Sequence, residues 1–458
     1  MTKLSRRKVF QAAGAAAVSA VAGGVVPPSA IAASQAGPAV VGSSGLDVKS
    51  VESFWISPPY KKNPANYIVP WREGHMTNTR PLCRVTLGNG IVGWGEGAVS
   101  NGARNLVMGR SGAESMWDDT LGGGLQMALF DAVGRANGVP IHRLLGRKYR
   151  DRAFLSWWAG GMEPRHWVEE CREAASLGYS AFKGKARPWY DLDEQCRVLT
   201  PTLPDNFQID FDFNSMLMDA GRGGPYLVEM EKYKQIAIWE TPIPQNDVEG
   251  NQMLRRKTHV PIAMHFGNPP IMTALREEVC DALIIGGGAG SVMRNGTIAA
   301  TAAKPFWLQM TGTSITATYA MHFAAVLSHA RLPGIHLHHL FAEAMIRPAI
   351  TVENGTAAIP DAPGLGVEID EDAVERYRAD EPPQRSVDGH LLALRWPSGT
   401  TSYYAREEMY KADFIAGRLP PFVKGIYVEE IPNDGGREWS ELQARAAKAG
   451  VHVGGKPM

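Results

Sequence analysis

Short apolar segments alternate with longer amphipathic stretches over the middle of the chain, between about Ala153 and Leu340. Segments of strand length, such as SAFKGK, FQIDFDFN, IAIWE and VPIAMH, are followed by stretches with helical periodicity, such as PRHWVEECREAASLG. Strands that alternate with helices pair in parallel, because each helix carries the chain back across the sheet. The pattern therefore predicts an α/β barrel of the TIM type over residues 151–345.

The segments on either side of this barrel predict a smaller α+β domain. LCRVTLGNGIVGWGE alternates around the dipeptide Asn89-Gly90, which is a strong hairpin signal, and GGLQMALFDAVGRANG has apolar residues at helical spacing. We assign this domain to residues 45–150 and expect the Pro/Gly-rich stretch 346–375 to return to it. Residues 376–458 form a C-terminal extension with strand-like HLLALRW and helical ELQARAAKAG. No site chemistry is visible in the extension, and its role stays open.

Charged side chains stand at the ends of the apolar segments. Lys183 and Lys185 end one segment, and Asp212, Glu240 and His265 end the next ones at intervals of 27, 28 and 25 residues from Lys185 onward. These intervals match one strand, one loop and one helix, so the side chains should meet at the carboxyl end of the barrel. Successive carboxylates at one barrel end are typical ligands of a hard divalent cation.

Composition and charge narrow the class of partner. The chain has 458 residues, 44% of them hydrophobic, which is enough for a large barrel and a second domain. Lys+Arg 47 balance Asp+Glu 47, so nothing attracts the whole molecule to nucleic acid or to an anionic membrane. The four cysteines lie in apolar patterns without CxxC spacing, which favours buried thiols over disulfides or a zinc cluster: Cys83, Cys171, Cys196 and Cys280.

The first 32 residues predict an export signal and are excluded from the fold. Arg6 and Arg7 precede an Ala-rich apolar stretch, which ends at the sequence Ala30-Ile31-Ala32. This order is similar to that of a twin-arginine signal peptide with cleavage after Ala32. A membrane anchor is the alternative, but the apolar stretch is shorter than the roughly 20 residues that span a bilayer. The mature chain is therefore expected in the periplasm or otherwise outside the cytoplasm, without a membrane span.

The order of several motifs resembles the enolase superfamily, in its mandelate racemase and muconate lactonizing branch. The resemblance covers roughly residues 51–376 and rests on GIVGWGEG, ALFDAVGRANGVPIHRLLG, GYSAFKGK, DFN, WETPI, VPIA and PDAPGLGVEID. It implies a (β/α)7β barrel closed by an α+β capping domain that the N-terminal segment and the residues after the barrel form together. It also implies that a divalent metal, Mg²⁺ as first choice, stabilises the enolate formed when the proton beside a carboxylate is removed.

The resemblance also implies roles for the residues at the strand ends. Lys185 corresponds to the base and Lys183 to its electrostatic partner, and side chains two apart on a strand share a face. Asp212 and Glu240 correspond to metal ligands, and Asn214 corresponds to a substrate contact. Two adjacent lysines and a metal ion should each lower a neighbouring amine pKa, which favours a neutral base. The alternatives are a pair of surface lysines, and acids that only cap the following helices.

One departure from the family pattern concerns the third metal ligand. The family has a carboxylate after the PIA strand, where this sequence has His265 and Phe266. Histidine binds divalent ions through a neutral imidazole, which makes Mn²⁺, Fe²⁺ or Zn²⁺ alternatives to Mg²⁺. His265 is thus a candidate ligand, and a structural histidine is the alternative.

A second departure concerns the base on the opposite side of the substrate. Near the seventh strand the chain has Gln309, Thr311 and Ser314 but no ionisable base, and Thr311 is assigned to substrate binding. A racemase needs two opposed bases, whereas syn elimination of water needs a single group that serves as base and acid. The eighth strand, IHLHH, has His336 and His338 on one face and His339 on the other. We assign His338 to proton donation and His336 to substrate contact, with histidines that have no chemical role as the alternative.

These observations together predict a metal-dependent enzyme acting on a small carboxylate. The function favoured by the sequence is dehydration of an acid sugar or related hydroxy acid by a lyase that takes the proton alpha to the carboxylate. A cycloisomerase or racemase of the same superfamily is the alternative within the enzymes, and a non-catalytic carboxylate-binding relative is the alternative outside them. The expected partner is the substrate, without nucleic acid, and a homo-oligomer is expected.

Overall fold

The structure is a computed structural model that describes residues 45–67, 78–379 and 389–454. The predicted export signal, residues 1–32, lies outside these ranges. No helix within the described residues combines the length and the apolar character that crossing a bilayer requires. The four cysteines are free and buried, as expected.

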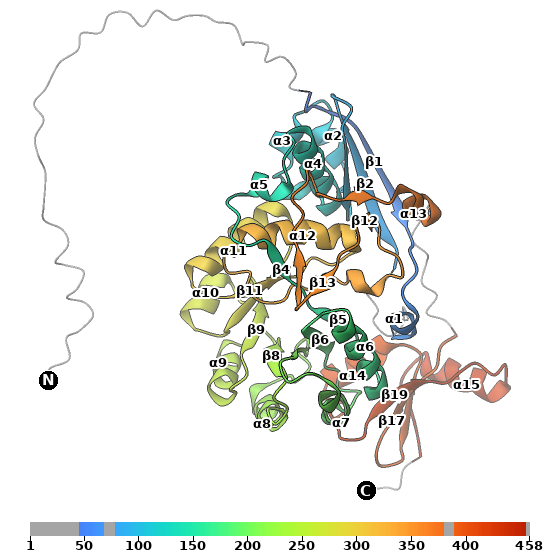
Figure 1. Cartoon of the computed structure of the whole chain (residues 1–458). Coiled ribbons are helices and arrows are strands. Elements are labelled where there is room, and N and C mark those ends of the chain that lie inside the picture. Colours follow the sequence, from blue (N-terminus) through green and yellow to red (C-terminus); the bar gives the residue numbers. More distant parts are fainter. Residues whose placement is uncertain (1–44, 68–77, 380–388, 455–458) are drawn as a thin grey trace, which may run out of the picture. The chain divides into compact units, whose positions relative to one another are not determined.

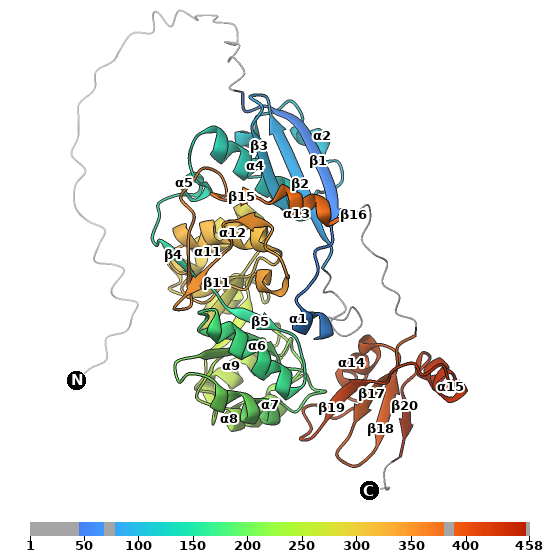
Figure 2. The ribbon, with the colours of Figure 1, turned by 45° about the vertical axis from the view of Figure 1, so that its right-hand side comes forward.

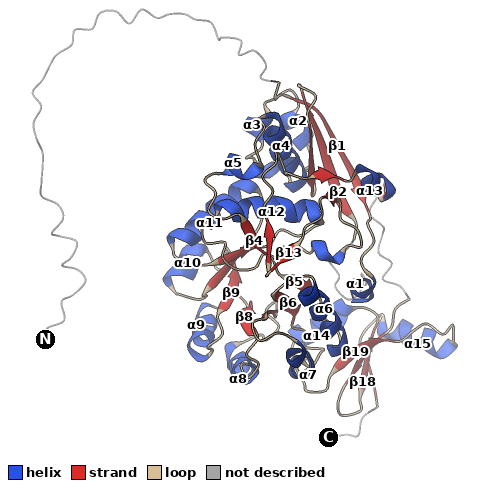
Figure 3. Cartoon of the chain, in the orientation of Figure 1, coloured by secondary structure: helices blue, strands red, loops and turns tan. Residues whose placement is uncertain are grey.

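A sheet of seven parallel strands forms the centre of the protein (Figure 1). The strands follow one another in chain order from one edge to the other, and their bounds are β5 Trp157–Ala159, β6 Ala181–Lys185, β7 Gln208–Asp212, β8 Ile236–Glu240, β9 Ile262–His265, β10 Ala282–Ile285 and β11 Phe306–Leu308. Helices follow these strands and surround them (Figure 3): α6 Pro164–Ser176, α7 Leu192–Leu199, α8 Ala220–Met230, α9 Val248–Lys257, α10 Ile271–Arg276, α11 Ala289–Thr301 and α12 Ser314–Val326. This arrangement confirms the predicted α/β barrel.

Short polar side chains start several of these helices. The side chains of Asp191, Asp219 and Asp247 accept hydrogen bonds from the backbone N–H groups three residues on, at the N-termini of α7, α8 and α9. Such caps satisfy donors that have no partner within the helix, and they fix the residue at which each of these three helices begins.

The eighth strand position is filled by a much shorter segment than the sequence predicts. Gly334 bridges in parallel to Leu155 and Ile335 bridges in parallel to Gln309, which joins the two edges of the sheet and closes the barrel. Leu337 then adopts a left-handed backbone with φ 66°. The chain continues as a 3-10 turn, η4 His338–Leu340, so the regular alternation expected for IHLHH stops before His338.

The capping domain combines segments from both sides of the barrel. Its antiparallel sheet has the order β16-β1-β2-β3, with bounds β1 Val48–Ile56, β2 Arg80–Leu87, β3 Val92–Glu96 and β16 Arg378–Ala379. The strands β2 and β3 pair around the predicted Asn89-Gly90 turn, where Gly90 has φ 83°. Helix α4 Gly123–Ala136 packs so closely on β3 that a Cβ added at Gly95 would lie 2.1 Å from the Gly124 carbonyl oxygen. Only glycine permits this approach of backbone to backbone.

Short elements connect these parts. The remaining elements up to β5 are α1 Lys62–Tyr67, α2 Ala103–Val107, α3 Gly112–Ser115, η2 Asp119–Leu121, α5 Ile141–Leu145 and β4 Arg152–Phe154. Those after β5 are η3 Thr200–Thr202, β12 Ile346–Arg347, β13 Val352–Glu353, β14 Thr356–Ala358, β15 Glu368–Ile369 and α13 Glu371–Arg376.

The C-terminal extension is a small α/β unit with its own antiparallel sheet (Figure 2). The strand order is β19-β17-β18-β20, and the bounds are β17 Leu392–Arg395, β18 Thr401–Tyr404, β19 Tyr427–Glu430, β20 Val451–Val453, α14 Glu407–Ile415 and α15 Arg437–Ala446. The segment HLLALRW contains β17, and ELQARAAKAG contains the second half of α15, which begins earlier, at Arg437.

Candidate active site

The parallel register brings the charged strand ends of the barrel together. Lys185 of β6 lies beside Asp212 of β7, and Asp212 lies beside Glu240 of β8. Lys183 is paired in the same way with Asp210, one layer deeper in the barrel. Residues that end neighbouring strands are adjacent in space, so the interval of 27 to 28 residues in the sequence becomes a side-by-side arrangement here.

The two lysines make different contacts with the acids. The Lys185 ammonium donates to Asp212 Oδ2 and to Asn214 Oδ1, the latter at 3.0 Å. Lys183 Nζ forms an ion pair with Glu240 Oε2, lies 3.5 Å from Asp212 Oδ2 and donates to Gln309 Oε1 at 3.0 Å. Lys183 is 1% exposed and Lys185 is 8% exposed. Lys185 is therefore the amine that a bound molecule can reach more easily.

The buried acids determine the protonation of this cluster. Burial opposes a charged Lys183, but Glu240 and Asp212 outweigh burial and hold the pKa of Lys183 above its usual range. Burial likewise opposes ionisation of Asp212, but Lys185 and Lys183 outweigh it and hold the pKa of Asp212 far below its usual range. At Asp210, burial and the charge of Glu240 raise the pKa well above its usual range. The pKa of Lys183 is thus raised, whereas two neighbouring lysines were expected to lower it, because the surrounding carboxylates have the larger effect.

Arg187 joins the cluster, although it was not among the site residues predicted from the sequence. Its guanidinium is 6% exposed and donates to Asn214 Oδ1 at 3.1 Å and to the Asp212 carbonyl oxygen at 3.4 Å. The sequence did carry a signal, because FKGKAR places a cationic residue at every second position. The end of β6 thus presents Lys183, Lys185 and Arg187 toward the acids of β7 and β8.

His265 ends β9 on the far side of Glu240. Its Nε2 atom lies 3.5 Å from Glu240 Oε1, and the side chain is 44% exposed. Among the described residues, both buried carboxylate oxygens of Glu240 lack a hydrogen-bond partner, although Lys183 pairs with one of them. Two buried carboxylates, Asp212 and Glu240, with an imidazole close to one of them are a donor set that fits a divalent ion. The described side chains nevertheless do not gather three His, Cys, Asp or Glu residues into a preformed metal site.

The other residues assigned to substrate binding lie around or outside this cluster. Asn214 contacts both Lys185 and Arg187, so the structure brings it to the site. Thr311 is exposed in the loop between β11 and α12. His336 is 3% exposed and its Nδ1 atom is 3.0 Å from the Met310 carbonyl oxygen, and burial lowers its pKa to about 4. The described hydrogen bonds of His336 do not reach the lysines or the acids.

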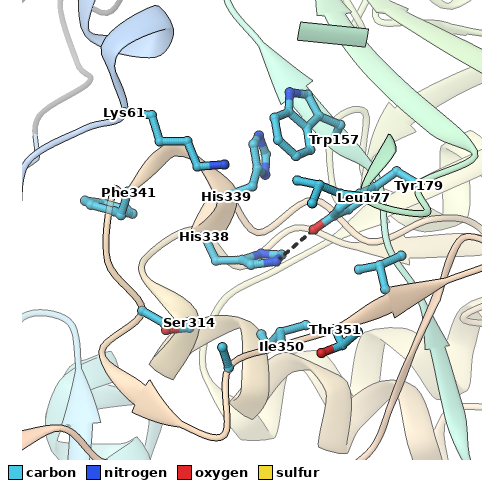
Figure 4. Close-up of a pocket in the computed structure, with 13 residues that line it drawn as sticks. Lys61, Trp157, Leu177, Tyr179, Ser314, His338, His339, Phe341, Ile350 and Thr351 are labelled. Atoms are coloured by element: carbon cyan, nitrogen blue, oxygen red, sulfur yellow. Dashed lines mark hydrogen bonds between the residues drawn. The ribbon is translucent and has the colours of Figure 1, made fainter. Parts of the chain in front are cut away.

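His338 lies in a different cavity (Figure 4). This cavity has a volume of about 310 Å³, and its lining includes Trp157, Tyr179, Phe341 and Lys61 but none of the charged residues at the strand ends. The Nε2 atom of His338 is 3.0 Å from the Tyr179 hydroxyl. Burial holds the pKa of His338 well below its usual range, so the ring is neutral. The strand pairing ends at Ile335 and Leu337 has a left-handed backbone, so the alternation that assigned His338 to proton donation does not extend to it. The structure does not bring His338 to Lys183 or Lys185.

A match to a protein family covers most of the barrel. Residues 166–373 match the family described as Enolase C-terminal domain-like. D-galactonate dehydratase from Xanthomonas oryzae pv. oryzae (strain PXO99A) is 25% identical over 354 residues, which are 66% of this chain and 92% of that protein. D-galactonate dehydratase from Xanthomonas campestris pv. campestris (strain B100) is 26% identical over 359 residues, with the same coverage of 66% and 92%.

Solved structures show the same fold at lower sequence identity. The muconate lactonizing enzyme from Pseudomonas fluorescens complexed with muconolactone has a TM-score of 0.60 and 19% identity, and covers 73% of this chain and 100% of its own. The N-succinyl Arg/Lys racemase from Bacillus cereus has a TM-score of 0.62 and 17% identity, and covers 73% and 98%. Residues 166–373 are therefore similar to the enolase C-terminal domain-like family, and the solved structures share the fold of this chain.

Proposed function

We propose that this chain is a lyase that removes the proton alpha to the carboxylate of an acid sugar and expels the β-hydroxyl group as water. The observation that carries the proposal is the contact of Lys185, the more exposed of the two amines at the end of β6, with Asp212 and Asn214. The similarity to proteins named D-galactonate dehydratase supports the same reaction class. An aldonic acid has the α-proton, the carboxylate and the β-hydroxyl group that this reaction requires.

Lys185 acts as the base in this proposal. Once Lys185 has lost its proton, its amine takes the α-proton of the substrate, and the resulting ammonium can return a proton to the departing hydroxyl group. Asp212 and Asn214 orient the amine, because both side chains accept hydrogen bonds from it. A single residue that acts first as base and then as acid fits a syn elimination.

Fixed positive charges can stabilise the negative charge that proton removal creates. Lys183 is held in the barrel interior by Glu240 and Gln309, so its ammonium needs no reorganisation during the reaction. Arg187 is held by Asn214 and by the Asp212 carbonyl oxygen, and it extends the positive charge toward the loop after β6. A guanidinium binds a carboxylate well, since its N–H groups match the two oxygens. We assign the substrate carboxylate to this cationic side.

Members of the enolase superfamily typically bind a divalent metal ion, and the donor set here fits one. Asp212 and Glu240 would hold the ion, with His265 as the third candidate ligand. When bound, a divalent ion supplies Lewis-acid stabilisation of the carboxylate oxygens. Mg²⁺ is the first choice because of the two carboxylates, and Mn²⁺, Fe²⁺ or Zn²⁺ are the alternatives because of the imidazole.

The residues that follow β11 favour dehydration over the alternatives. Racemisation requires a second base on the other face of the substrate, and the chain after β11 has Gln309, Thr311 and Ser314, the first residue of α12, at the positions where such a base is expected. Gln309 already accepts a hydrogen bond from Lys183. A cycloisomerase of the same superfamily remains the second enzymatic candidate, and a carboxylate-binding protein without catalysis remains the non-enzymatic one.

Proton exchange in D₂O tests the enzymatic proposal. The purified protein is incubated with D-galactonate and a panel of other aldonates, and loss of the α-proton signal is followed by NMR with and without added Mg²⁺ or Mn²⁺. We expect exchange and dehydration with at least one aldonate, and a loss of about 10²- to 10⁴-fold in Lys185→Met. Lys234→Met, an exposed lysine after α8, is the matched control and should keep full activity. Equal activity of Lys185→Met and wild type would refute the role of Lys185.

Metal binding has a test that does not depend on turnover. Calorimetric titration of the apoprotein with Mg²⁺, Mn²⁺ and Zn²⁺ should give a binding signal that is lost in Glu240→Gln. His265→Ala should weaken Mn²⁺ and Zn²⁺ more than Mg²⁺ if its imidazole is a ligand. Unchanged binding of all ions in Glu240→Gln would place the metal elsewhere.

We also infer that the chain is exported by the twin-arginine pathway and acts as a homo-oligomer. Cell fractionation of wild type and of a variant with Lys at both Arg6 and Arg7 should show a periplasmic protein and a retained precursor, respectively. Light scattering after size-exclusion chromatography gives the oligomeric state. A mass equal to that of a single chain would contradict the proposed homo-oligomer.

A further inference from the structure

The core of the C-terminal extension includes residues of the barrel loops that carry the candidate active site. Trp189 and Tyr190, from the loop between β6 and α7, and Met216, from the loop between β7 and α8, belong to the same buried cluster as Tyr410 and Phe414 of α14. The Trp189 ring lies 4.9 Å from the Tyr410 ring and 5.8 Å from the Phe414 ring. Trp189 is 3% exposed. The extension and these two loops therefore form one hydrophobic core.

Phe422, between α14 and β19, contacts aromatic residues next to the site. Its ring lies 5.6 Å from the ring of Phe213 and 5.0 Å from the ring of Tyr226 on α8. Phe213 is fully buried and stands between Asp212 and Asn214 in the chain. Phe422 thus supports the residue that separates a candidate metal ligand from the amide that holds Lys185 and Arg187.

A polar contact fixes the loop after β6 from the same side. The Gly425 N–H donates to Asp191 Oδ2 at 2.7 Å, while Asp191 Oδ1 accepts from Glu194 N and caps α7. One carboxylate thus joins the extension to the first turn of the helix that follows Arg187. Lys424 adds an ion pair with Glu229 of α8 at 2.9 Å, but its side chain is 67% exposed, so this pair contributes little.

The turn after β7 has a backbone that needs outside support. Asn214, Ser215 and Met218 have φ angles of 45°, 68° and 68°, in the left-handed region that residues with a Cβ rarely adopt. Such conformations persist where surrounding contacts over-determine them. Ser215 N donates to the Thr241 carbonyl oxygen at 2.8 Å, and Met216 packs into the core of the extension. The barrel and the extension therefore hold this turn from both sides.

We propose that the C-terminal extension is a fixed clamp that positions the active-site loops, with Phe422 and Phe414 as positioning residues. Phe422 supports the turn that presents Asn214 to Lys185, and Phe414 supports Trp189 and with it the loop that presents Arg187. Neither phenylalanine belongs to the lysine and carboxylate cluster, so each acts through the loops. The catalytic part of this inference depends on the proposed function, whereas the effect on the loops does not.

Hydrogen exchange of the full-length protein tests the clamp without a substrate. In Phe422→Ala and in Phe414→Ala, amides in segments 186–191 and 213–219 should exchange at least tenfold faster than in wild type, while β9 and β10 keep their protection. Trp439→Ala is the matched control, because Trp439 of α15 packs within the extension against Leu391 and Ala446. This cluster is separate from the one that contains Trp189 and Met216, so the control should loosen only the α15 side of the extension and leave both segments unchanged. If Phe422→Ala does not fold, Phe422→Leu gives the same comparison with a smaller loss of volume.

Kinetics then separate positioning from mere stability. With an aldonate that the wild type converts, Phe422→Ala should lower kcat at least tenfold with a smaller change of KM, and Phe422→Tyr should restore most of it. Unchanged exchange of both segments in the two alanine variants overturns the clamp, whether or not a substrate has been found. Faster exchange without any aldonate turnover in wild type leaves the clamp supported and rejects the proposed function instead.

Discussion

Glu170 of α6 is expected to make the stability of this protein depend on pH. Its side chain is 1% exposed, and its two oxygens accept hydrogen bonds from Trp157 Nε1 at 2.7 Å and Asn63 Nδ2 at 2.6 Å. Burial nevertheless outweighs these donors and raises the pKa of Glu170 from the usual 4.5 to about 6. The charged form is thus less favourable in the folded protein than in the unfolded chain.

The magnitude follows from the difference between the two pKa values. A tenfold change in an ionisation constant corresponds to about 1.4 kcal/mol, so a pKa of about 6 against 4.5 corresponds to about 2 kcal/mol. Below pH 4.5 both states bind the proton and the penalty is absent. Between pH 4.5 and 6 the unfolded chain loses the proton first, so the free energy of unfolding falls as the pH rises, and above pH 6 the full penalty applies.

Glu170→Gln removes this titration and keeps the shape of the side chain. Urea unfolding of wild type and variant, followed by circular dichroism from pH 4 to 7.5, should show the wild type losing about 2 kcal/mol relative to the variant over this range. Any constant offset from the altered hydrogen bonds cancels in this comparison. Glu249→Gln, an exposed acid on α9, should show no such relative change. The reasoning fails if the difference between wild type and Glu170→Gln does not vary with pH.

Two further substitutions test how the capping domain is built. Glu96 is 4% exposed and accepts hydrogen bonds from the backbone N–H and hydroxyl groups of Thr313 and Thr316 at the start of α12. Glu96→Gln should therefore lower the free energy of unfolding by about 3 kcal/mol. Glu52→Gln, which removes the charge from an exposed ion pair, should change it by less than about 0.5 kcal/mol. Equal melting temperatures of these two variants would contradict the buried linkage. In Gly95→Ala the added Cβ would lie 2.1 Å from the Gly124 carbonyl oxygen and must displace α4. This variant should lower the free energy of unfolding, measured in denaturant, by more than about 3 kcal/mol. In Gly123→Ala the added Cβ meets nothing within 4 Å, so the free energy of unfolding should stay close to that of wild type. Similar midpoints for both alanine variants would mean that β3 and α4 pack less closely than described.

The candidate site shows how far strand patterns predict chemistry. Lys185, Asp212 and Glu240 could be placed together from the sequence, because parallel strands of equal spacing must end at one face of the barrel. Arg187 continued the same alternation and could have been found from it. The direction in which the pKa of Lys183 shifts could not be predicted, because it depends on how many buried carboxylates surround the amine. Glu240 contributes most among these carboxylates and comes from β8, which is not adjacent to β6 in the sheet.

Local patterns in the sequence determined the elements and their order: the period of two in each strand, the caps of the helices, the Asn89-Gly90 turn and the glycines of β3. These features depend on neighbours along the chain, so the residues themselves specify them. Tertiary packing alone decided where IHLHH stops being a strand, which places His338 in a separate cavity beside Tyr179. The docking of the extension on Trp189 and Phe213 was likewise decided by packing, because an aromatic residue in a loop signals burial but not its partner. Contacts between residues some two hundred positions apart depend on how complete surfaces fit together. The hydrophobic periodicity of a strand or a helix carries no information about that fit.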